Sequence, residues 1–122
     1  MRVAVPTTGD GLGSEVDVRF GRAPKFLLVD TDTMSFESIE NAQNLNLPQG
    51  AGIQSAQNVI QHKPDVVLTG NCGPKAFQVF QAAGVEVVVG ASGTVLEAVQ
   101  AYMDGKYRKA RSANVEGHWG AG

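Results

Sequence analysis

The chain has few of the residues on which several protein classes depend. It contains one cysteine, Cys72, among 122 residues, and its formal net charge is only −2. A lone cysteine excludes an internal disulfide and a closed zinc or iron–sulfur site built from several thiolates, and it fits a reducing compartment. The small net charge excludes a global basic field for nucleic acid or an anionic membrane. Any anion site must therefore be built locally.

Long apolar runs are also missing. No window approaches the roughly 20 apolar residues that span a bilayer, and the run from Met1 to Pro6 is too short for a signal peptide. We therefore expect a cytoplasmic protein without a membrane partner. Hydrophobic residues make up 43% of the chain, which is enough for a real core. We expect one α/β domain over residues 1–108 and a flexible tail over 109–122.

Short apolar runs alternate with helical patterns along the chain. Apolar runs predict buried strands, an alternating stretch predicts a half-buried strand that closes a hairpin, and apolar residues at helical spacing predict helices. Strands that alternate with helices favour a central, mostly parallel sheet covered on both faces, and the hairpin makes that sheet mixed. The expected strands are 3–5, 26–30, 35–40, 66–69 and 85–89, and the expected helices are 52–62, 74–83 and 95–104.

The turn over residues 69–75, which we name the Cys72 turn, joins a buried strand to a helix. Its helix begins at Pro74, and the first amides of a helix have no internal partners and attract anions. Open α/β sheets bind ligands at this edge. The glycines admit a ligand to the backbone, while Cys72 offers a soft sulfur and Lys75 a cation. The alternative is an ordinary tight turn with a partly buried thiol.

The turn over residues 90–94, named here the Ser92 turn, precedes the last predicted helix. We expect its geometry to be similar and the two turns to border one pocket. Thr94 and Glu97 fit a capping box, so ordinary helix capping is the alternative interpretation. Neither turn matches a phosphate-binding loop or a dinucleotide fingerprint, so nucleotide binding has little support.

Two arginines flank an aromatic residue and a glycine at Arg19-Phe20-Gly21-Arg22. Arginine presents several fixed donors that suit sulfides and oxoanions. The alternative is surface solubility with Phe20 anchored in the core. His62 is expected to cap a helix end. His118 lies in the tail, which we expect to be disordered; the alternative is that His118 folds over a bound ligand.

Several segments together carry a family resemblance. The start at 1–5, the segment 16–26 around Arg-Phe-Gly-Arg-Ala-Pro, the Gly50-Ala51-Gly52 stretch and the segment 70–77 occur in this order. Over residues 1 to about 110 the chain resembles the dinitrogenase iron–molybdenum cofactor biosynthesis family, and within it the small stand-alone members. The resemblance implies a ribonuclease H-like, three-layer α/β/α fold with a five-stranded mixed sheet.

The resemblance also implies a function. It implies non-covalent binding of an iron–molybdenum cofactor, a precursor, or a molybdenum–copper sulfide cluster, without catalysis. It also implies that the host organism is an anaerobe. Cluster-assembly or ATPase proteins are the implied partners, and we expect a monomer. Some members carry a histidine-rich glycine loop near residue 50, whereas Asn46 to Ile53 holds no histidine here. That departure speaks against the iron–molybdenum cofactor and leaves a cationic, amide-lined pocket intact.

The predicted site combines the two turns with the two arginines, and Cys72 is its expected metal ligand. A metal-free regulatory or protein-interaction module on the same fold is the alternative. A nuclease, suggested by fold analogy, needs clustered carboxylates, and the first strand holds none. The predicted cluster-binding residues are Arg19, Arg22, Gly70, Asn71, Cys72, Gly73, Lys75, Ser92, Gly93 and Thr94.

Overall fold

The computed structural model describes residues 1–41 and 51–107. The predicted tail with His118, and most of the polar segment before the first helix, lie outside the described residues. The elements are β1 (Arg2–Thr7), the short 3-10 helix η1 (Phe20–Arg22), β2 (Lys25–Asp30), β3 (Phe36–Glu40), α1 (Ala51–Ile60), β4 (Val66–Leu68), α2 (Pro74–Ala82), β5 (Glu86–Val88) and α3 (Val95–Met103).

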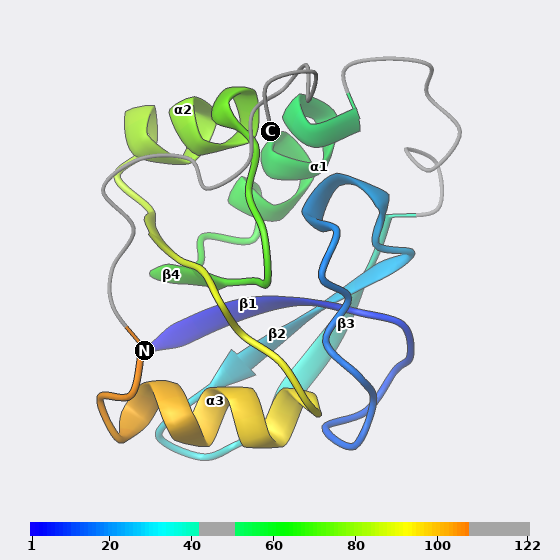
Figure 1. The fold of residues 1–122 in the computed structure, drawn as a ribbon, viewed down its shortest axis with the longest axis vertical. Helices are drawn as coiled ribbons and strands as arrows, with labels where there is room; N and C mark the ends of the chain where they lie inside the picture. Colours follow the sequence, from blue (N-terminus) through cyan, green and yellow to red (C-terminus); the bar gives the residue numbers. More distant parts are fainter. Residues whose placement is uncertain (42–50, 108–122) are drawn as a thin grey trace.

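The five strands form one mixed sheet in the order β3-β2-β1-β4-β5. β2 runs antiparallel to both β1 and β3, while β1, β4 and β5 run parallel to one another. Figure 1 shows α1 and α2 on one face of this sheet and α3 on the other. The predicted three-layer α/β/α fold with a five-stranded mixed sheet is therefore confirmed. The carboxyl ends of the three parallel strands meet at one edge.

Alternating strand residues supply two separate cores. In β1, Ala4 faces the core beneath α1 and α2, whereas Val3 and Val5 face the core beneath α3. The first core contains four buried phenylalanines, and Phe20 contacts two of them, Phe26 and Phe80, with ring centroids 5.1 and 5.2 Å apart. The predicted anchoring of Phe20 in the core is confirmed, so the arginines on either side of it start from a fixed backbone.

One expected boundary is wrong, because Pro6 does not close the first strand. β1 continues to Thr7, with Pro6 opposite Phe26 of β2. A proline interrupts a central strand when its missing N–H is needed for the ladder. Here the β1–β4 ladder pairs only Val3 and Ala4, so that side of the strand is open at Pro6. The Pro6 carbonyl accepts the amide of Asp17 instead, at 2.9 Å.

The helix ends follow their sequence signals. Thr94 and Glu97 form the predicted capping box, with the Thr94 Oγ1 accepting the Glu97 amide at 3.1 Å and a Glu97 carboxylate oxygen accepting the Thr94 amide at 2.9 Å. Gly84 ends α2 with a φ of 75°, which confirms it as the residue after the C-cap. None of the helices in the described ranges is long and apolar enough to cross a membrane.

Candidate anion-binding site

The two predicted turns lie side by side at the carboxyl edge of the parallel strands. The Gly90 amide donates to the Gly70 carbonyl at 3.0 Å, and the Ala91 amide donates to the Thr69 carbonyl at 3.1 Å. These bonds continue the β4–β5 pairing beyond the strands themselves. The two turns are therefore neighbours, while the expectation that they border one pocket stays a prediction. They differ in how the loop that crosses them bonds to each.

Residues 8–19, which we name the crossing loop, run over both turns. The Val18 carbonyl accepts the Asn71 amide at 3.1 Å, and the Gly93 carbonyl accepts the Val16 amide at 2.9 Å. Short bridges align Arg19 with Asn71 and Glu15 with Thr94. The crossing loop therefore brings a cation to the Cys72 turn and a carboxylate to the Ser92 turn.

At the Ser92 turn, the helix amides are already used. The Val95 amide donates to the Ser14 carbonyl and the Leu96 amide to the Leu12 carbonyl, both at 2.9 Å. The next amide, of Glu97, is held by the capping box. Since an anion at a helix N-terminus needs free N–H donors, this turn has none to offer in its first three helical residues. Ser92, Gly93 and Thr94 as ligands remain a prediction that these hydrogen bonds do not favour.

The Cys72 turn is different. The N-cap of α2 is Gly73, which has no side chain to accept a helix amide, and Pro74 has no amide hydrogen. The Phe77 amide donates to the Gly73 carbonyl at 3.0 Å. Within residues 1–41 and 51–107, the amides of Lys75 and Ala76 have no acceptor. Two donors with partial positive charge are therefore available at the start of this helix.

A buried carboxylate holds Arg19 beside this turn. The Asp17 Oδ1 accepts both the Arg19 amide, at 2.9 Å, and the Arg19 Nε–H, at 3.4 Å. The Asp17 side chain is 5% exposed, whereas the Arg19 side chain is 67% exposed. Sequence reasoning missed this role, although an aspartate two residues before the arginine is a known signal for such a local turn. Arg22 follows within η1 and is exposed.

A buried polar group fixes the backbone around Arg22. The Asn41 side-chain amide donates to the Ala23 carbonyl at 2.8 Å and to the Ser55 Oγ at 3.0 Å. The Ser55 hydroxyl in turn donates to the Gly21 carbonyl at 3.4 Å. Both side chains are fully buried. No local sequence pattern predicts this group, because it joins residues that are far apart in the chain.

Close backbone approach explains two glycines near the arginines. A Cβ on Gly70 would lie 2.9 Å from the Cα of Val18, and a Cβ on Gly21 would lie 3.0 Å from the Cα of Gly52. Neither distance leaves room for a side chain. These glycines therefore let the crossing loop lie directly on the Cys72 turn and let η1 lie directly on α1.

Cys72 itself belongs to the core beneath α1 and α2. Its side chain is 1% exposed, and burial raises the pKa of the thiol to about 12. A thiol is a good metal ligand only as the thiolate. Metal ligation by Cys72 stays a prediction, and it would require the ligand to enter the core or the turn to open.

Direct metal ligands do not gather in the part of the chain that the structure describes. No three His, Cys, Asp or Glu side chains lie close enough there to hold a metal ion. At the Cys72 turn, the structure offers two amides without an acceptor among the described residues, the exposed ammonium of Lys75 and, from the neighbouring loop, the guanidinium of Arg19. This donor set fits an anion that brings its own metal ligands.

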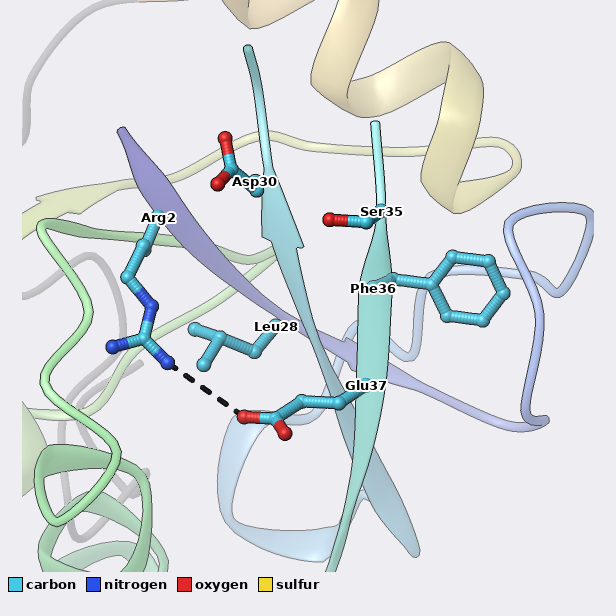
Figure 2. Close-up of a pocket in the computed structure, with 6 residues that line it drawn as sticks. All are labelled: Arg2, Leu28, Asp30, Ser35, Phe36 and Glu37. Carbon is cyan, nitrogen blue, oxygen red and sulfur yellow. Dashed lines mark ion pairs between the residues drawn. The ribbon is translucent and has the colours of Figure 1, made fainter. Parts of the chain in front are cut away.

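A hollow of about 270 Å³ lies at the other end of the sheet, and Figure 2 shows its lining. The Arg2 guanidinium points at Glu37, 3.6 Å away, over Leu28, while Phe36 points away. His62 Nδ1 also lies 3.9 Å from the Glu37 carboxylate. Because its guanidinium is already paired and Asp30 adds a second carboxylate to the lining, the hollow does not suit an anion.

Comparison with known proteins decides the family. The model of the dinitrogenase iron–molybdenum cofactor family matches residues 1–105. The chain belongs to this family. This member is 45% identical to the orange protein of Desulfovibrio gigas, solved in its apo form, with a TM-score of 0.90 over 93% of this chain and 95% of that one.

Two further relatives are less similar to this chain than the orange protein is. A Thermotoga protein described as a candidate NifB protein is 34% identical, with a TM-score of 0.77, and the match covers 88% of this chain and 91% of that one. An uncharacterised protein of Methanocaldococcus jannaschii is 27% identical over 111 residues, which are 89% of this chain and 91% of the relative. Family and neighbours together mark this family member as a cofactor-related protein.

Proposed function

We propose that this family member binds an anionic metal–sulfur cluster as non-covalent cargo at the Cys72 turn. The cargo is a molybdenum–copper sulfide cluster or a cluster of the iron–molybdenum cofactor type. The observation that carries the proposal is the pair of amides at Lys75 and Ala76 that have no acceptor among the described residues, with the backbone of Arg19 aligned beside Asn71. Gly70 and Gly73 keep side chains away from these donors, and Arg22, three residues after Arg19, is a second exposed cation.

The chemistry of such a cluster matches the donors. Its metals are already bound by sulfide, so it needs N–H donors and positive charge more than protein thiolates. Charge-assisted hydrogen bonds are roughly twice as strong as neutral ones, and a guanidinium presents five N–H donors in a fixed fork. A single helix N-terminus with arginine beside it can therefore hold an anion without any covalent bond.

This proposal makes the chain a carrier and not a catalyst. No group of three His, Cys, Asp or Glu side chains in the described ranges could hold the metal ion that a metal-dependent hydrolysis requires. Transfer of the cluster to cluster-assembly or ATPase proteins, the monomeric state and the cytoplasmic location stay predictions. They rest on the family and on the sequence.

The test is reconstitution. Protein purified without oxygen is mixed with tetrathiomolybdate and Cu(I), desalted, and measured for visible absorption and for molybdenum, copper and sulfide. We expect charge-transfer bands that survive desalting, with molybdenum retained in a fixed ratio to protein. Loss of all colour on desalting contradicts the molybdenum–copper version. Metal-free protein from an oxygen-protected native source favours the regulatory or interaction module instead.

A further inference from the structure

Asp17 is a buried carboxylate close in the chain to the proposed anion site, where a negative charge is unfavourable for anion binding. Its side chain is 5% exposed, in the crossing loop two residues before Arg19. Its own amide donates to the Pro6 carbonyl at 2.9 Å, so its backbone is fixed to β1. A negative charge near an anion weakens binding by Coulomb repulsion, and burial of the charge strengthens that effect. A favourable role of this side chain must therefore offset the repulsion.

We propose that Asp17 is a positioning residue, which aims the Arg19 guanidinium at the ligand of the Cys72 turn. This inference rests on the proposed function of that turn. The Asp17 Oδ1 accepts the Arg19 Nε–H at 3.4 Å and the Arg19 amide at 2.9 Å. One of the five guanidinium donors is thus used for anchoring, and the four N–H groups on the two terminal nitrogens are left for a ligand, on a side chain that is 67% exposed.

Anchoring matters because the Arg19 side chain is otherwise exposed. A free arginine loses rotamer freedom when it binds a ligand, and that loss lowers affinity. An arginine already held at Nε has lost part of this freedom before the ligand arrives. The bond to Asp17 therefore makes the guanidinium a partly preorganised donor, carried by a backbone that is paired with Asn71.

The proposal predicts an effect of unusual sign. Asp17→Asn removes one negative charge beside an anion site, so repulsion alone predicts tighter binding. Positioning predicts the reverse, since the amide no longer holds the guanidinium as an ion pair. We expect Asp17→Asn to bind tetrathiomolybdate about twofold to tenfold more weakly than the wild type, from the lost preorganisation of one long side chain. Tighter binding overturns the proposal.

Glu15 supplies the matched control. It lies two residues away in the same loop, exposed, and aligned with Thr94 at the other turn. Glu15→Gln removes the same charge without touching Arg19, so its affinity should stay equal to or slightly above that of the wild type. In an Arg19→Ala background, Asp17→Asn should no longer weaken binding. A full loss that persists without Arg19 contradicts a role through that residue.

A second readout does not depend on any ligand. The Nε–H proton of Arg19 should give a protected resonance in the NMR spectrum of the wild-type protein, and Asp17→Asn should speed its exchange with water. If the wild type shows this protection but binds no tetrathiomolybdate, the proposed cargo fails and the anchoring stands. If the proton exchanges equally fast in both proteins, the positioning role is wrong whatever the binding result.

A third variant covers the case in which Asp17→Asn does not fold. Arg19→Lys keeps the charge and leaves Asp17 in place, but a lysine cannot be anchored at one nitrogen and donate from others in a fixed fork. Its affinity should fall by a similar factor, about twofold to tenfold. Wild-type affinity in Arg19→Lys means that a point charge suffices, which overturns the proposal.

Discussion

The Cys72 turn and the Ser92 turn occupy similar positions in the fold, but they differ in whether the first amides of the following helix are hydrogen-bonded. Each follows a short parallel strand, contains glycines and opens a nine-residue helix. At the Ser92 turn, the crossing loop and the capping box take the first three helix amides, of Val95, Leu96 and Glu97. At the Cys72 turn, the loop bonds only to Asn71, upstream of the helix, and leaves the amides of Lys75 and Ala76 without an acceptor in the described residues.

The lesson is that a helix N-terminus is a site only when nothing else uses it. One loop closes the Ser92 turn with its carbonyls and the Cys72 turn stays open a few residues further along the same loop. The charges follow the same division, with Glu15 beside the closed turn and Arg19 beside the open one. The difference between the turns is therefore the strongest guide to where a ligand binds.

The largest expected effect comes from closing the open turn. Gly73→Asp places a capping carboxylate at the N-cap of α2, where the backbone is extended (φ −74°, ψ 168°) and accepts any residue. That carboxylate would take the Lys75 and Ala76 amides and repel an anion. Losing two hydrogen bonds to a charged group costs about 3 kcal/mol or more, so tetrathiomolybdate affinity should fall more than 100-fold.

Ser92→Asp is the control for that change. It adds the same charge at the closed turn, where no ligand is expected, and its affinity should stay within about twofold of the wild type, as expected for an exposed, screened charge. Isothermal titration of both variants measures the contrast. Equal losses in the two would mean that net charge, and not the open helix end, determines binding.

A smaller effect should follow from separating the crossing loop from the Cys72 turn. Gly70→Ala pushes a methyl group against Val18, which should cost about 1–3 kcal/mol of folding stability and weaken binding by moving Arg19. Gly93→Ala at the other turn forces a side chain into a φ of 83°, which should cost about 1–2 kcal/mol and leave affinity unchanged. Urea unfolding and titration of each variant check both halves of this statement.

Removing the capping box should change stability alone. Thr94→Ala loses the side-chain acceptor for the Glu97 amide and should destabilise the fold by about 1 kcal/mol. Because this turn is not the proposed site, tetrathiomolybdate affinity should be the same as in the wild type. A clear drop in affinity at unchanged fold would show that the Ser92 turn takes part in binding.

The expected effect on binding is also small at Cys72. Because burial raises the thiol pKa from 9.0 to about 12, the folded protein should not react with a thiol reagent at pH 8, whereas the unfolded protein should. Cys72→Ala should keep tetrathiomolybdate affinity within about twofold, the scatter expected for a group that does not touch the ligand. A large loss would identify Cys72 as the metal ligand that its sequence position suggests.

The same shift predicts a pH dependence of stability. The unfolded thiol ionises above its ordinary pKa of 9.0 while the folded thiol stays protonated to about 12. The raised pKa therefore contributes stability that is present below pH 9 and lost as the pH rises towards 12. Unfolding curves over this range should decline more steeply for the wild type than for Cys72→Ala, which lacks the group.

Much of this architecture follows from local sequence signals. The apolar runs predicted the strands, and the capping box at Thr94 and the glycine at position 84 predicted helix ends. These predictions succeed because each feature depends on residues that are close in the chain. The prediction that Pro6 ends the first strand was wrong, because whether a strand can contain a proline there depends on where the β1–β4 ladder stops. That is a property of the sheet and not of the segment.

Only part of the candidate site could be predicted from the sequence. The two turns looked equivalent because their residues are similar. The difference between them comes from the carbonyls of Leu12 and Ser14, which accept helix amides at the Ser92 turn and belong to a loop without a regular sequence pattern. Asp17 appeared as one of several scattered acids, and its burial against Arg19 needs the folded loop. Contacts between distant segments are what the sequence alone leaves open.

One measurement tests the difference between the turns most directly. Tetrathiomolybdate is titrated into ¹⁵N-labelled protein, and the amide resonances at the two helix N-termini are followed by NMR. The account predicts large, saturable shifts at Lys75 and Ala76, and little change at Val95, Leu96 and Glu97, whose protons are already bonded within the fold. Shifts at the second set without the first would contradict it, as would no saturable shift at either.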